Sequence, residues 1–315
     1  MRPRIRIAFA RFWPGFVPDD FGRWFPFLAD RYDLVVSSEP DVVFYSVFSL
    51  RFRRGYDPRR AASLARYPKG DYVRVFLTGE NVEPEMDDCE FAIGYSTLVE
   101  HPDFLRLPLW VVENRAFGYG PERLVKAPGT DWERVADAKS GFCAFVSSWS
   151  VSFRNAIVER LARVGRVDSA GSVMNTMGGR RVPSEPNRMA GKAAFLKRYK
   201  FTLAVENTIW PGYQTEKLVD PMHADSVPIY VGDPQASATF DPASYIDLSR
   251  FGSLTEMLEF VREIEADRAR YLAMLAAPWY RGNQLPAFAR DETIAAFLDR
   301  IFAAALARRG RARGR

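Results

Sequence analysis

The chain has 315 residues, of which 47% are hydrophobic and 26% charged, a globular composition long enough for two domains of ordinary size. Its formal net charge is +5, and much of the basic excess lies near the C-terminus. Zinc-finger spacing and RNA-binding signatures are absent from the sequence, so we expect no nucleic-acid partner.

The two cysteines, Cys89 and Cys143, do not form a CxxC pair, and we expect free, buried thiols rather than a disulfide or a zinc site. The apolar run after Met1-Arg-Pro-Arg is too short for a signal peptide or a membrane span. These observations predict a soluble or peripheral protein of the cytoplasm.

In the first half of the chain, short apolar runs rich in β-branched residues alternate with segments of helical character. Such runs are typical of strands that are buried on both faces of a parallel sheet. The predicted strands are Ile5–Phe9, Asp33–Ser37, Asp41–Ser46, Tyr72–Leu77 and Phe91–Gly94, and the predicted helices are Asp20–Tyr32 and Arg59–Arg66.

A second αβ pattern follows the segment Arg115–Ser140, which is interrupted by glycine and proline and marks a domain junction. Its predicted strands are Phe142–Val146, Phe201–Val205 and Val227–Val231, and its predicted helices are Phe153–Val164, a helix from Thr215, and Leu254–Leu275. The fold class is therefore α/β, with two Rossmann-like domains facing each other across a cleft. We place the first domain at 1–125, the second at 140–285, and a C-terminal helix with a basic tail at 286–315.

The segment Tyr199–Asp220 carries the most chemical information. A strand ends in Glu206 and Asn207, and a glycine-containing loop leads to Thr215, a good helix N-cap that is followed by Glu216 and Lys217. The backbone N–H groups at a helix N-terminus, together with an ammonium group, suit a diphosphate. The tripeptide Thr-Glu-Lys by itself also fits an alternative without a ligand, namely an ordinary capped helix whose lysine is solvated.

The longer pattern resembles the α1,3/4-fucosyltransferase family. The residues that carry this resemblance are Tyr199-Lys-Phe201, Val205-Glu-Asn207, Tyr213-Gln-Thr-Glu-Lys217 and Val227-Pro-Ile229 with Gly232 and Pro234. Weaker similarities, including Thr78-Gly-Glu-Asn81 and Phe153-Arg-Asn-Ala156, extend it over most of 72–245. Gln214 departs from the valine that is frequent in bacterial members, and Pro221 lies inside the helix that Thr215 begins.

The resemblance implies a GT-B-type glycosyltransferase that inverts the anomeric centre of GDP-fucose. Glu80 would be the catalytic base, while Glu83 and Glu85 lie off the motif. Arg154 and Lys217 would hold the diphosphate, because a guanidinium fork and an ammonium both bind phosphate oxygens. The rest of the donor pocket would be formed by Glu216, which faces sugar or ribose hydroxyls, by Tyr213 and Asn207, and by Glu206 as a further contributor.

We expect no metal and no cofactor, because the sequence has no Asp-x-Asp motif and its two histidines, His101 and His223, lie off the motifs. The predicted reaction moves L-fucose to a 3- or 4-hydroxyl of N-acetylglucosamine or glucose in a galactose-containing oligosaccharide. A transferase for another GDP-sugar and an inactive sugar-binding homologue are the alternatives. Phe12–Phe16 and Tyr45–Phe48 are candidate walls of the acceptor cleft, with ordinary core packing as the alternative.

The C-terminal segment from Thr293 is predicted to be a helix, because its apolar residues recur at spacings of three and four. Packing of that face against the protein is the plain interpretation. Peripheral contact of the arginine-rich end with an anionic membrane is the alternative. The apolar positions are Ile294, Phe297, Leu298, Ile301, Phe302, Ala305 and Leu306, and the arginines are Arg308, Arg309, Arg311, Arg313 and Arg315.

Overall fold

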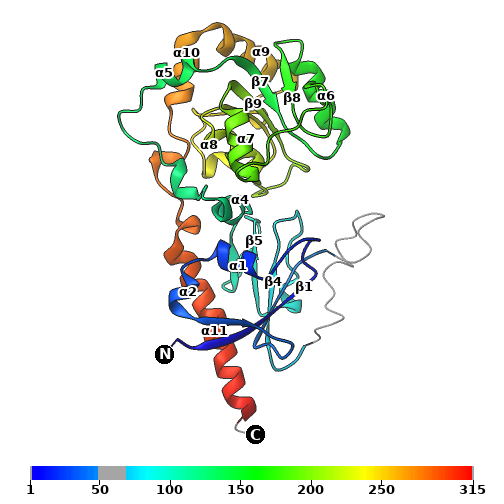
Figure 1. Ribbon diagram of the computed structural model, residues 1–315, viewed down its shortest axis with the longest axis vertical. Helices are drawn as coiled ribbons and strands as arrows, with labels where there is room; N and C mark the ends of the chain where they lie inside the picture. Colours follow the sequence, from blue (N-terminus) through cyan, green and yellow to red (C-terminus); the bar gives the residue numbers. More distant parts are fainter. Residues whose placement is uncertain (1, 49–68, 314–315) are drawn as a thin grey trace. The chain divides into compact units, whose positions relative to one another are not determined.

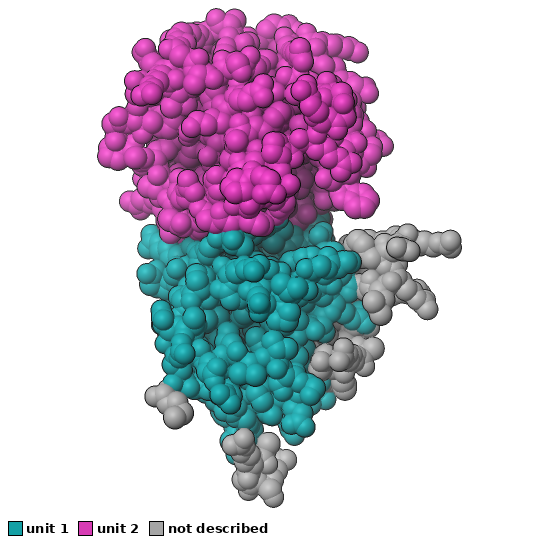
Figure 2. Space-filling model, in the orientation of Figure 1, with its two compact units in different colours: residues 1–116, 287–315 teal, residues 117–286 magenta. Residues whose placement is uncertain are grey.

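The computed structural model describes residues 2–48 and 69–313, and these residues form two compact units. The first unit contains the residues up to Ala116 together with those from Ala287 onward, and the second contains Phe117–Pro286 (Figure 2). The predicted helix Arg59–Arg66 lies outside the described residues.

The first unit is built on a six-stranded sheet in which every pair of neighbouring strands is parallel (Figure 1). In sheet order, the strands are β2 (Asp33–Val36), β1 (Arg4–Ala10), β3 (Val42–Tyr45), β4 (Val73–Leu77), β5 (Phe91–Gly94) and β6 (Phe104–Arg106). Every residue of β3, β4 and β5 is buried, as expected for the middle of a sheet that is covered on both faces.

Helices of the first unit are α1 (Asp19–Trp24), α2 (Leu28–Arg31), α4 (Trp110–Glu113) and α11 (Asp291–Arg313). The single helix predicted over Asp20–Tyr32 is wrong, because the chain breaks at Phe25 into α1 and α2. Pro26 disfavours helical geometry in the residue before it, and Phe25 has φ −128° and ψ 63°.

Helix α11 contacts β1, β3 and β4, so the C-terminal segment belongs to the first unit instead of standing apart. Its predicted apolar face is buried against that unit, with Ile294, Leu298, Ile301 and Phe302 all inaccessible to solvent. At its end, Arg308 Nη1 lies 3.2 Å from Glu90 Oε1 and Arg309 Nη1 lies 2.9 Å from Asp41 Oδ2. The plain interpretation of the helix is confirmed, and these two arginines are engaged with carboxylates.

The second unit has a five-stranded sheet, which is also parallel throughout. Its strands in sheet order are β11 (Ile246–Asp247), β10 (Val227–Val231), β9 (Tyr199–Val205), β7 (Gly141–Phe145) and β8 (Val167–Ser169). Its helices are α5 (Trp132–Asp137), α6 (Ser152–Leu161), α7 (Arg188–Leu196), α8 (Glu216–His223), α9 (Leu254–Ala266) and α10 (Arg268–Ala276).

Every second residue of β9 packs into the main core of this unit. Phe201, Leu203 and Val205 contact the core that includes α6, α9 and α10, as the period of two along a strand predicts. Tyr199, at the start of the strand, belongs instead to a second cluster with Phe195 and Leu196 of α7. The predicted α/β class, with two Rossmann-like domains, is confirmed.

The long helix predicted over Leu254–Leu275 is interrupted at Asp267, whose backbone is extended with φ −108° and ψ 99°. The Asp267 carboxylate accepts a hydrogen bond from the Arg270 N–H at 3.0 Å, so the residue caps the start of α10. The described residues also contain short 3-10 turns, which are η2 (Met86–Asp88), η3 (Arg115–Phe117), η4 (Pro121–Leu124), η5 (Ala236–Ala238), η6 (Leu248–Arg250), η7 (Arg281–Asn283) and η8 (Ala287–Ala289).

Candidate functional site

The candidate site of the second unit lies where two adjacent parallel strands, β7 and β9, end. Ala144 of β7 is paired with Thr202 of β9, so the loops that leave the two strands begin next to each other. Ligands of open α/β sheets bind beyond the carboxyl ends of the strands. Ser147 follows β7, and Glu206 and Asn207 follow β9, so polar groups are present at this edge.

Arg154, in the first turn of α6, joins these two loops. Its Nη1 donates to Ser147 Oγ at 2.8 Å, and its Nη2 donates to Asn207 Oδ1 at 2.5 Å. The residue is only 2% exposed, and its Nε has no hydrogen-bond partner among the residues that the structure describes. Burial lowers the pKa of Arg154 from its ordinary value, yet a guanidinium stays charged at any working pH. A buried cation with an unused donor group suits an anionic ligand.

Glu206 connects the end of β9 to the start of α8. Its Oε1 accepts a hydrogen bond from the Thr215 N–H at 2.8 Å, and its Oε2 accepts one from Thr215 Oγ1 at 2.7 Å. The side chain of Thr215 caps the helix by accepting from the Lys217 N–H at 3.4 Å. The predicted N-cap is therefore confirmed, and the helix continues past Pro221 to His223.

Lys217 extends from the first turn of α8 into a group of oxygen atoms. Its Nζ lies 3.0 Å from Thr215 Oγ1, 3.3 Å from Glu206 Oε2 and 3.7 Å from Glu216 Oε1. Burial alone would lower the pKa of Lys217, but the Glu216 and Glu206 carboxylates outweigh burial and raise it. The ammonium is therefore fully protonated at neutral pH, as binding of a diphosphate requires.

A third cation, Lys192 on α7, was not predicted from the sequence. Its Nζ lies 2.5 Å from Asp220 Oδ2, one helical turn beyond Glu216 on α8. Burial would raise the pKa of Glu216, but the charges of Lys217, Lys192 and Arg188 lower it to about 2. Glu216 is therefore a carboxylate throughout the physiological pH range.

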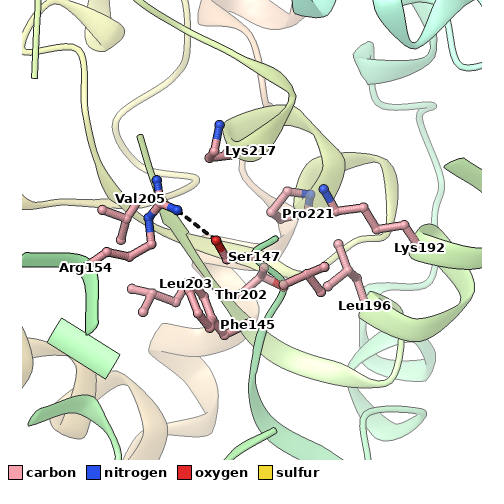
Figure 3. A pocket seen from close by; sticks show the side chains of 11 residues that line it. Phe145, Ser147, Arg154, Lys192, Leu196, Thr202, Leu203, Val205, Lys217 and Pro221 are labelled. Carbon is pink, nitrogen blue, oxygen red and sulfur yellow. Dashed lines mark hydrogen bonds between the residues drawn. The ribbon is translucent and has the colours of Figure 1, made fainter. Parts of the chain in front are cut away.

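Arg154, Lys192 and Lys217 all line one pocket of about 330 Å³, a volume that includes its opening to solvent. Figure 3 shows Arg154 and Lys192 pointing toward each other from opposite sides, with Ser147, the hydrogen-bond partner of Arg154, between them. The remaining walls come mainly from the two strands and from Leu196 and Pro221. Three cations around one pocket can neutralise an anion as highly charged as a diphosphate.

The loop before α8 is held by a second buried carboxylate, Asp233. Its Oδ1 accepts from the Gly212 N–H at 2.8 Å, and its Oδ2 accepts from Gln214 Nε2 at 2.7 Å. Gln214 therefore has a partner that valine at this position would lack. Gly212 has φ +80°, a conformation that favours glycine. Tyr213 is 3% exposed and is not among the residues that line the pocket.

Glu80, the predicted base, lies in the first unit just beyond the carboxyl end of β4. Its N–H donates to Thr78 Oγ1 at 3.1 Å, and its side chain is half-buried. Next to it, Asn81 Oδ1 accepts from Tyr95 OH at 2.5 Å and Glu83 Oε1 accepts from Ser96 Oγ at 2.6 Å, which ties the loop to the end of β5. The structure thus groups Arg154, Asn207, Glu216 and Lys217 in the second unit and places Glu80 in the first.

The candidate acceptor walls divide into two kinds. Tyr45 is 1% exposed and belongs to the hydrophobic core, so its interpretation as a wall is wrong. Phe12, Trp13 and Phe16 are half-buried, and the Phe12 and Phe16 rings stack with centroids 4.2 Å apart. These three rings follow β1 and present part of their surface to solvent.

The remaining sequence expectations concern cysteines, metals and membranes. Cys89 and Cys143 are free and buried, as predicted. His223 packs edge-on against the Tyr119 ring. Burial and the charge of the nearby Arg123 lower the pKa of His223 to about 3. Within residues 2–48 and 69–313, no three His, Cys, Asp or Glu side chains are grouped so that they could hold a metal ion. Over the same ranges, no helix has the length and apolar character that crossing a bilayer requires.

Comparison with known proteins agrees with this geometry. The family model "Glycosyltransferase family 10 (fucosyltransferase) C-term" matches residues 135–293, and the model of the α-(1,3)-fucosyltransferase FucT N-terminal domain matches residues 7–113. The α-(1,3)-fucosyltransferase FucT of Helicobacter pylori is 28% identical over an alignment of 301 residues, which covers 87% of this chain. The chain spans 60% of the length of that relative.

Two further similar proteins match different shares of this chain. An α-(1,4)-fucosyltransferase of Arabidopsis thaliana is 41% identical over 76 residues, which are 24% of this chain and 19% of that protein. The crystal structure of an α1,3-fucosyltransferase with GDP-fucose has a TM-score of 0.72 and 25% identity, and the match covers 96% of this chain and 91% of that one.

Similarity of fold extends further than similarity of sequence. HepE of Anabaena, solved with UDP and glucose, has a TM-score of 0.56 at 9% identity, covering 94% of this chain and 99% of that one. The architecture is thus the two-domain GT-B type of glycosyltransferase. With a family model that matches half of its residues and a second model over most of the remainder, the chain belongs to glycosyltransferase family 10, the fucosyltransferases.

Proposed function

We propose that this protein transfers L-fucose from GDP-fucose to a hydroxyl group of a sugar acceptor. The observation that carries the proposal is the pocket in which Arg154, Lys192 and Lys217 converge beside the N-terminus of α8. The diphosphate is the anionic part of GDP-fucose. Membership of family 10, the fucosyltransferases, indicates that the sugar of the donor is fucose. The related α1,3-fucosyltransferase solved with GDP-fucose supports this choice of donor.

In the proposed reaction, Arg154 and Lys217 bind the diphosphate and stabilise the negative charge that grows on it as GDP leaves. Glu216 is ionised and accepts hydrogen bonds from hydroxyl groups of the fucose or the ribose. Glu80 takes the proton of the acceptor hydroxyl as its oxygen forms a bond to C1 of fucose. The bond from C1 to the phosphate oxygen breaks on the opposite face, so the β-linked donor yields an α-fucoside. We propose that these side chains suffice without a resident metal or cofactor.

For the acceptor, we propose N-acetylglucosamine or glucose within a galactose-containing oligosaccharide, modified at the 3- or 4-hydroxyl. The relatives support both linkages, since one is named for α-(1,3) and another for α-(1,4) transfer. Phe12, Trp13 and Phe16 present partly exposed rings in the first unit, and such rings stack on the apolar faces of sugars. We propose that they contact the acceptor.

The direct test is to incubate the protein with GDP-fucose and with lactose or N-acetyllactosamine, followed by mass spectrometry and linkage analysis of the products. A fucosylated product with an α linkage is expected. Release of GDP from another GDP-sugar, with none from GDP-fucose, would replace this proposal by the first alternative. Tight GDP binding without turnover of any donor would favour the inactive sugar-binding homologue.

Two expectations about location remain proposals: residence in the cytoplasm and peripheral contact of the C-terminus with an anionic membrane. Arg308 and Arg309 are bound to Glu90 and Asp41. The membrane proposal therefore depends on the arginines that follow them.

A further inference from the structure

Glu206 has the burial of a core residue and the charge of a surface residue. Its side chain is 0% exposed, although an ionised carboxylate is costly to remove from water unless it is paired. Burial raises the pKa of Glu206, while Lys217 and the two hydrogen bonds from Thr215 oppose that shift. The surrounding backbone is shaped to fit it, because a Cβ atom on Gly232 would lie 2.6 Å from Glu206 Cγ.

Both oxygens of Glu206 are directed at the start of α8. Oε1 binds the Thr215 N–H, and Oε2 binds the Thr215 hydroxyl and lies 3.3 Å from Lys217 Nζ. Glu206 is not among the residues that line the pocket, whereas Lys217 is. The carboxylate is therefore placed to act on the ammonium and not on a bound donor.

The neighbouring residue acts in the same way on the second cation. Asn207 Oδ1 accepts a hydrogen bond from Arg154 Nη2 at 2.5 Å. Two consecutive residues at the end of β9 thus hold cations that come from two different helices, α6 and α8. Because β9 is a central strand whose residues are all buried except Lys200, it is a rigid reference point for both.

We propose that Glu206 is a positioning residue that fixes Lys217 for the diphosphate of the donor, and that it does not itself contact the sugar nucleotide. This inference rests on the proposed donor site. Glu206 holds the ammonium in place before the ligand arrives, so less conformational entropy is lost when GDP binds. The same contacts fix the N-terminal turn of α8, whose N–H groups face the anion.

A double-mutant cycle tests this inference by calorimetry with GDP, using Glu206→Gln, Lys217→Met and the double variant. Each single substitution is expected to weaken GDP binding by about 10- to 100-fold, the scale of losing a charge-assisted hydrogen bond. If Glu206 acts through Lys217, the double variant binds GDP within about threefold of Lys217→Met.

Additive losses in the double variant would overturn the positioning role and leave the donor site intact. Unchanged GDP affinity in Lys217→Met would overturn the donor-site assignment and the inference with it. The two failures are therefore distinguishable from the same set of titrations.

Asp233→Asn is the matched control for the loss of a buried carboxylate. Asp233 is also 0% exposed, but its bonded partners are Gly212, Gln214 and Gln235, none of them a cation. Its effect on GDP binding is expected to add to that of Lys217→Met. If Asp233→Asn shows the same non-additivity as Glu206→Gln, the coupling is a general loss of structure and the inference fails.

A second pair of variants applies if Glu206→Gln does not fold. Thr215→Ser keeps the hydroxyl group that Glu206 and Lys217 share, and Thr215→Val removes it at nearly constant volume. GDP affinity is expected to fall about tenfold in Thr215→Val, the scale of one hydrogen bond to a charged group, and to stay near normal in Thr215→Ser. Equal affinities in the two variants would contradict the proposal.

Discussion

The two units hold ion-paired carboxylates at opposite ends of their sheets. In the first unit, Asp41 and Glu90 stand immediately before β3 and β5, at the amino ends of parallel strands. Asp41 binds Arg6 and Arg309, and Glu90 binds Arg308. In the second unit, Glu206 stands immediately after β9, at the carboxyl end, and binds Lys217.

This difference separates two roles of an ion pair between a carboxylate and a cationic side chain. At the amino ends, the arginines of α11 join a distant segment of the chain to the sheet. At the carboxyl end, the cations Lys217 and Arg154 also line a pocket, so part of their charge faces a space that a ligand can enter. The end of the sheet at which an ion pair lies distinguishes the structural pairs of this protein from its candidate binding site.

The substitution with the largest expected effect is at Glu80, and it tests whether the carboxyl end of the sheet in the first unit also takes part in the reaction. Glu80→Gln keeps the size of the side chain and removes the base, so kcat is expected to fall by about 10²- to 10⁴-fold with GDP affinity retained. Steady-state kinetics with GDP-fucose and calorimetry with GDP measure both quantities. Glu85→Gln, an exposed carboxylate nearby, is the control and should keep its rate. Near-normal kcat in Glu80→Gln would mean that the base lies elsewhere.

Removing a cation from the pocket should have the next largest effect. Arg154→Ala is expected to weaken GDP binding by about 1.5–3 kcal/mol, since charge-assisted hydrogen bonds are lost. Arg160→Ala, on the exposed side of the same helix, should bind GDP as the unaltered protein does. Equal GDP affinities for the two variants in calorimetry would contradict the donor-site assignment.

Asp41→Asn tests the structural pair of the first unit. Burial alone would raise the pKa of Asp41, but the hydrogen bonds from Arg6 and the charge of Arg309 outweigh it and lower the pKa. The Asp41 carboxylate therefore contributes stability above its unfolded pKa of about 3.9, and that stability is lost as pH falls through the lower folded value. Asp41→Asn is expected to cost about 1–3 kcal/mol at neutral pH and to flatten this acid dependence.

Chemical denaturation at several pH values measures that change. Asp33→Asn removes the exposed pair with Arg4 and should change the free energy of unfolding by less than about 1 kcal/mol. A change in GDP affinity in Asp41→Asn would mean that the amino end of the first sheet also affects the binding site.

Two truncations of the C-terminus should have small effects on stability that differ from each other. Ending the chain after Arg309 keeps both arginine pairs, and the melting temperature should stay the same. Ending it after Ala307 removes them and should lower that temperature by a few degrees, as expected for the loss of about 1 kcal/mol. If the tail binds membranes, the first truncation abolishes sedimentation with phosphatidylglycerol vesicles. Sedimentation that survives it would refute the membrane proposal.

The smallest expected effect is that of chelation. Excess EDTA should leave most fucosyl transfer intact, because Arg154, Lys192 and Lys217 supply the positive charge that a metal ion provides elsewhere. Product formation with and without EDTA is the measurement. Complete loss of activity that Mn²⁺ restores would contradict the metal-free proposal.

The sequence predicted the central strands well, because β3 and β10 are continuous apolar runs and β9 is mostly apolar from Phe201 to Val205. It missed β6, β8 and β11, which have only two or three residues and so show no period. Helix α7 also went unpredicted, although Asn187 caps it.

The site was predictable where it depends on local sequence. The N-cap at Thr215 and the charges of Lys217 and Arg154 follow from the motif and its resemblance. The role of Lys192 depends on packing between α7 and α8, which no local pattern encodes. Glu206 was expected to contribute to the donor pocket, but the position of its carboxylate under α8 depends on how β9, β10 and the helix meet.

The return of α11 to the first unit has a consequence for synthesis on the ribosome. Residues 117–286 form the second unit, and the first unit needs residues from both sides of that range. At about 5–20 residues per second, synthesis from residue 117 to the end of α11 takes about 10–40 seconds. For that time, the second unit can fold while the six-stranded sheet lacks the helix that covers β1, β3 and β4. The first unit, and not the second, therefore keeps part of its sheet uncovered for longer during synthesis.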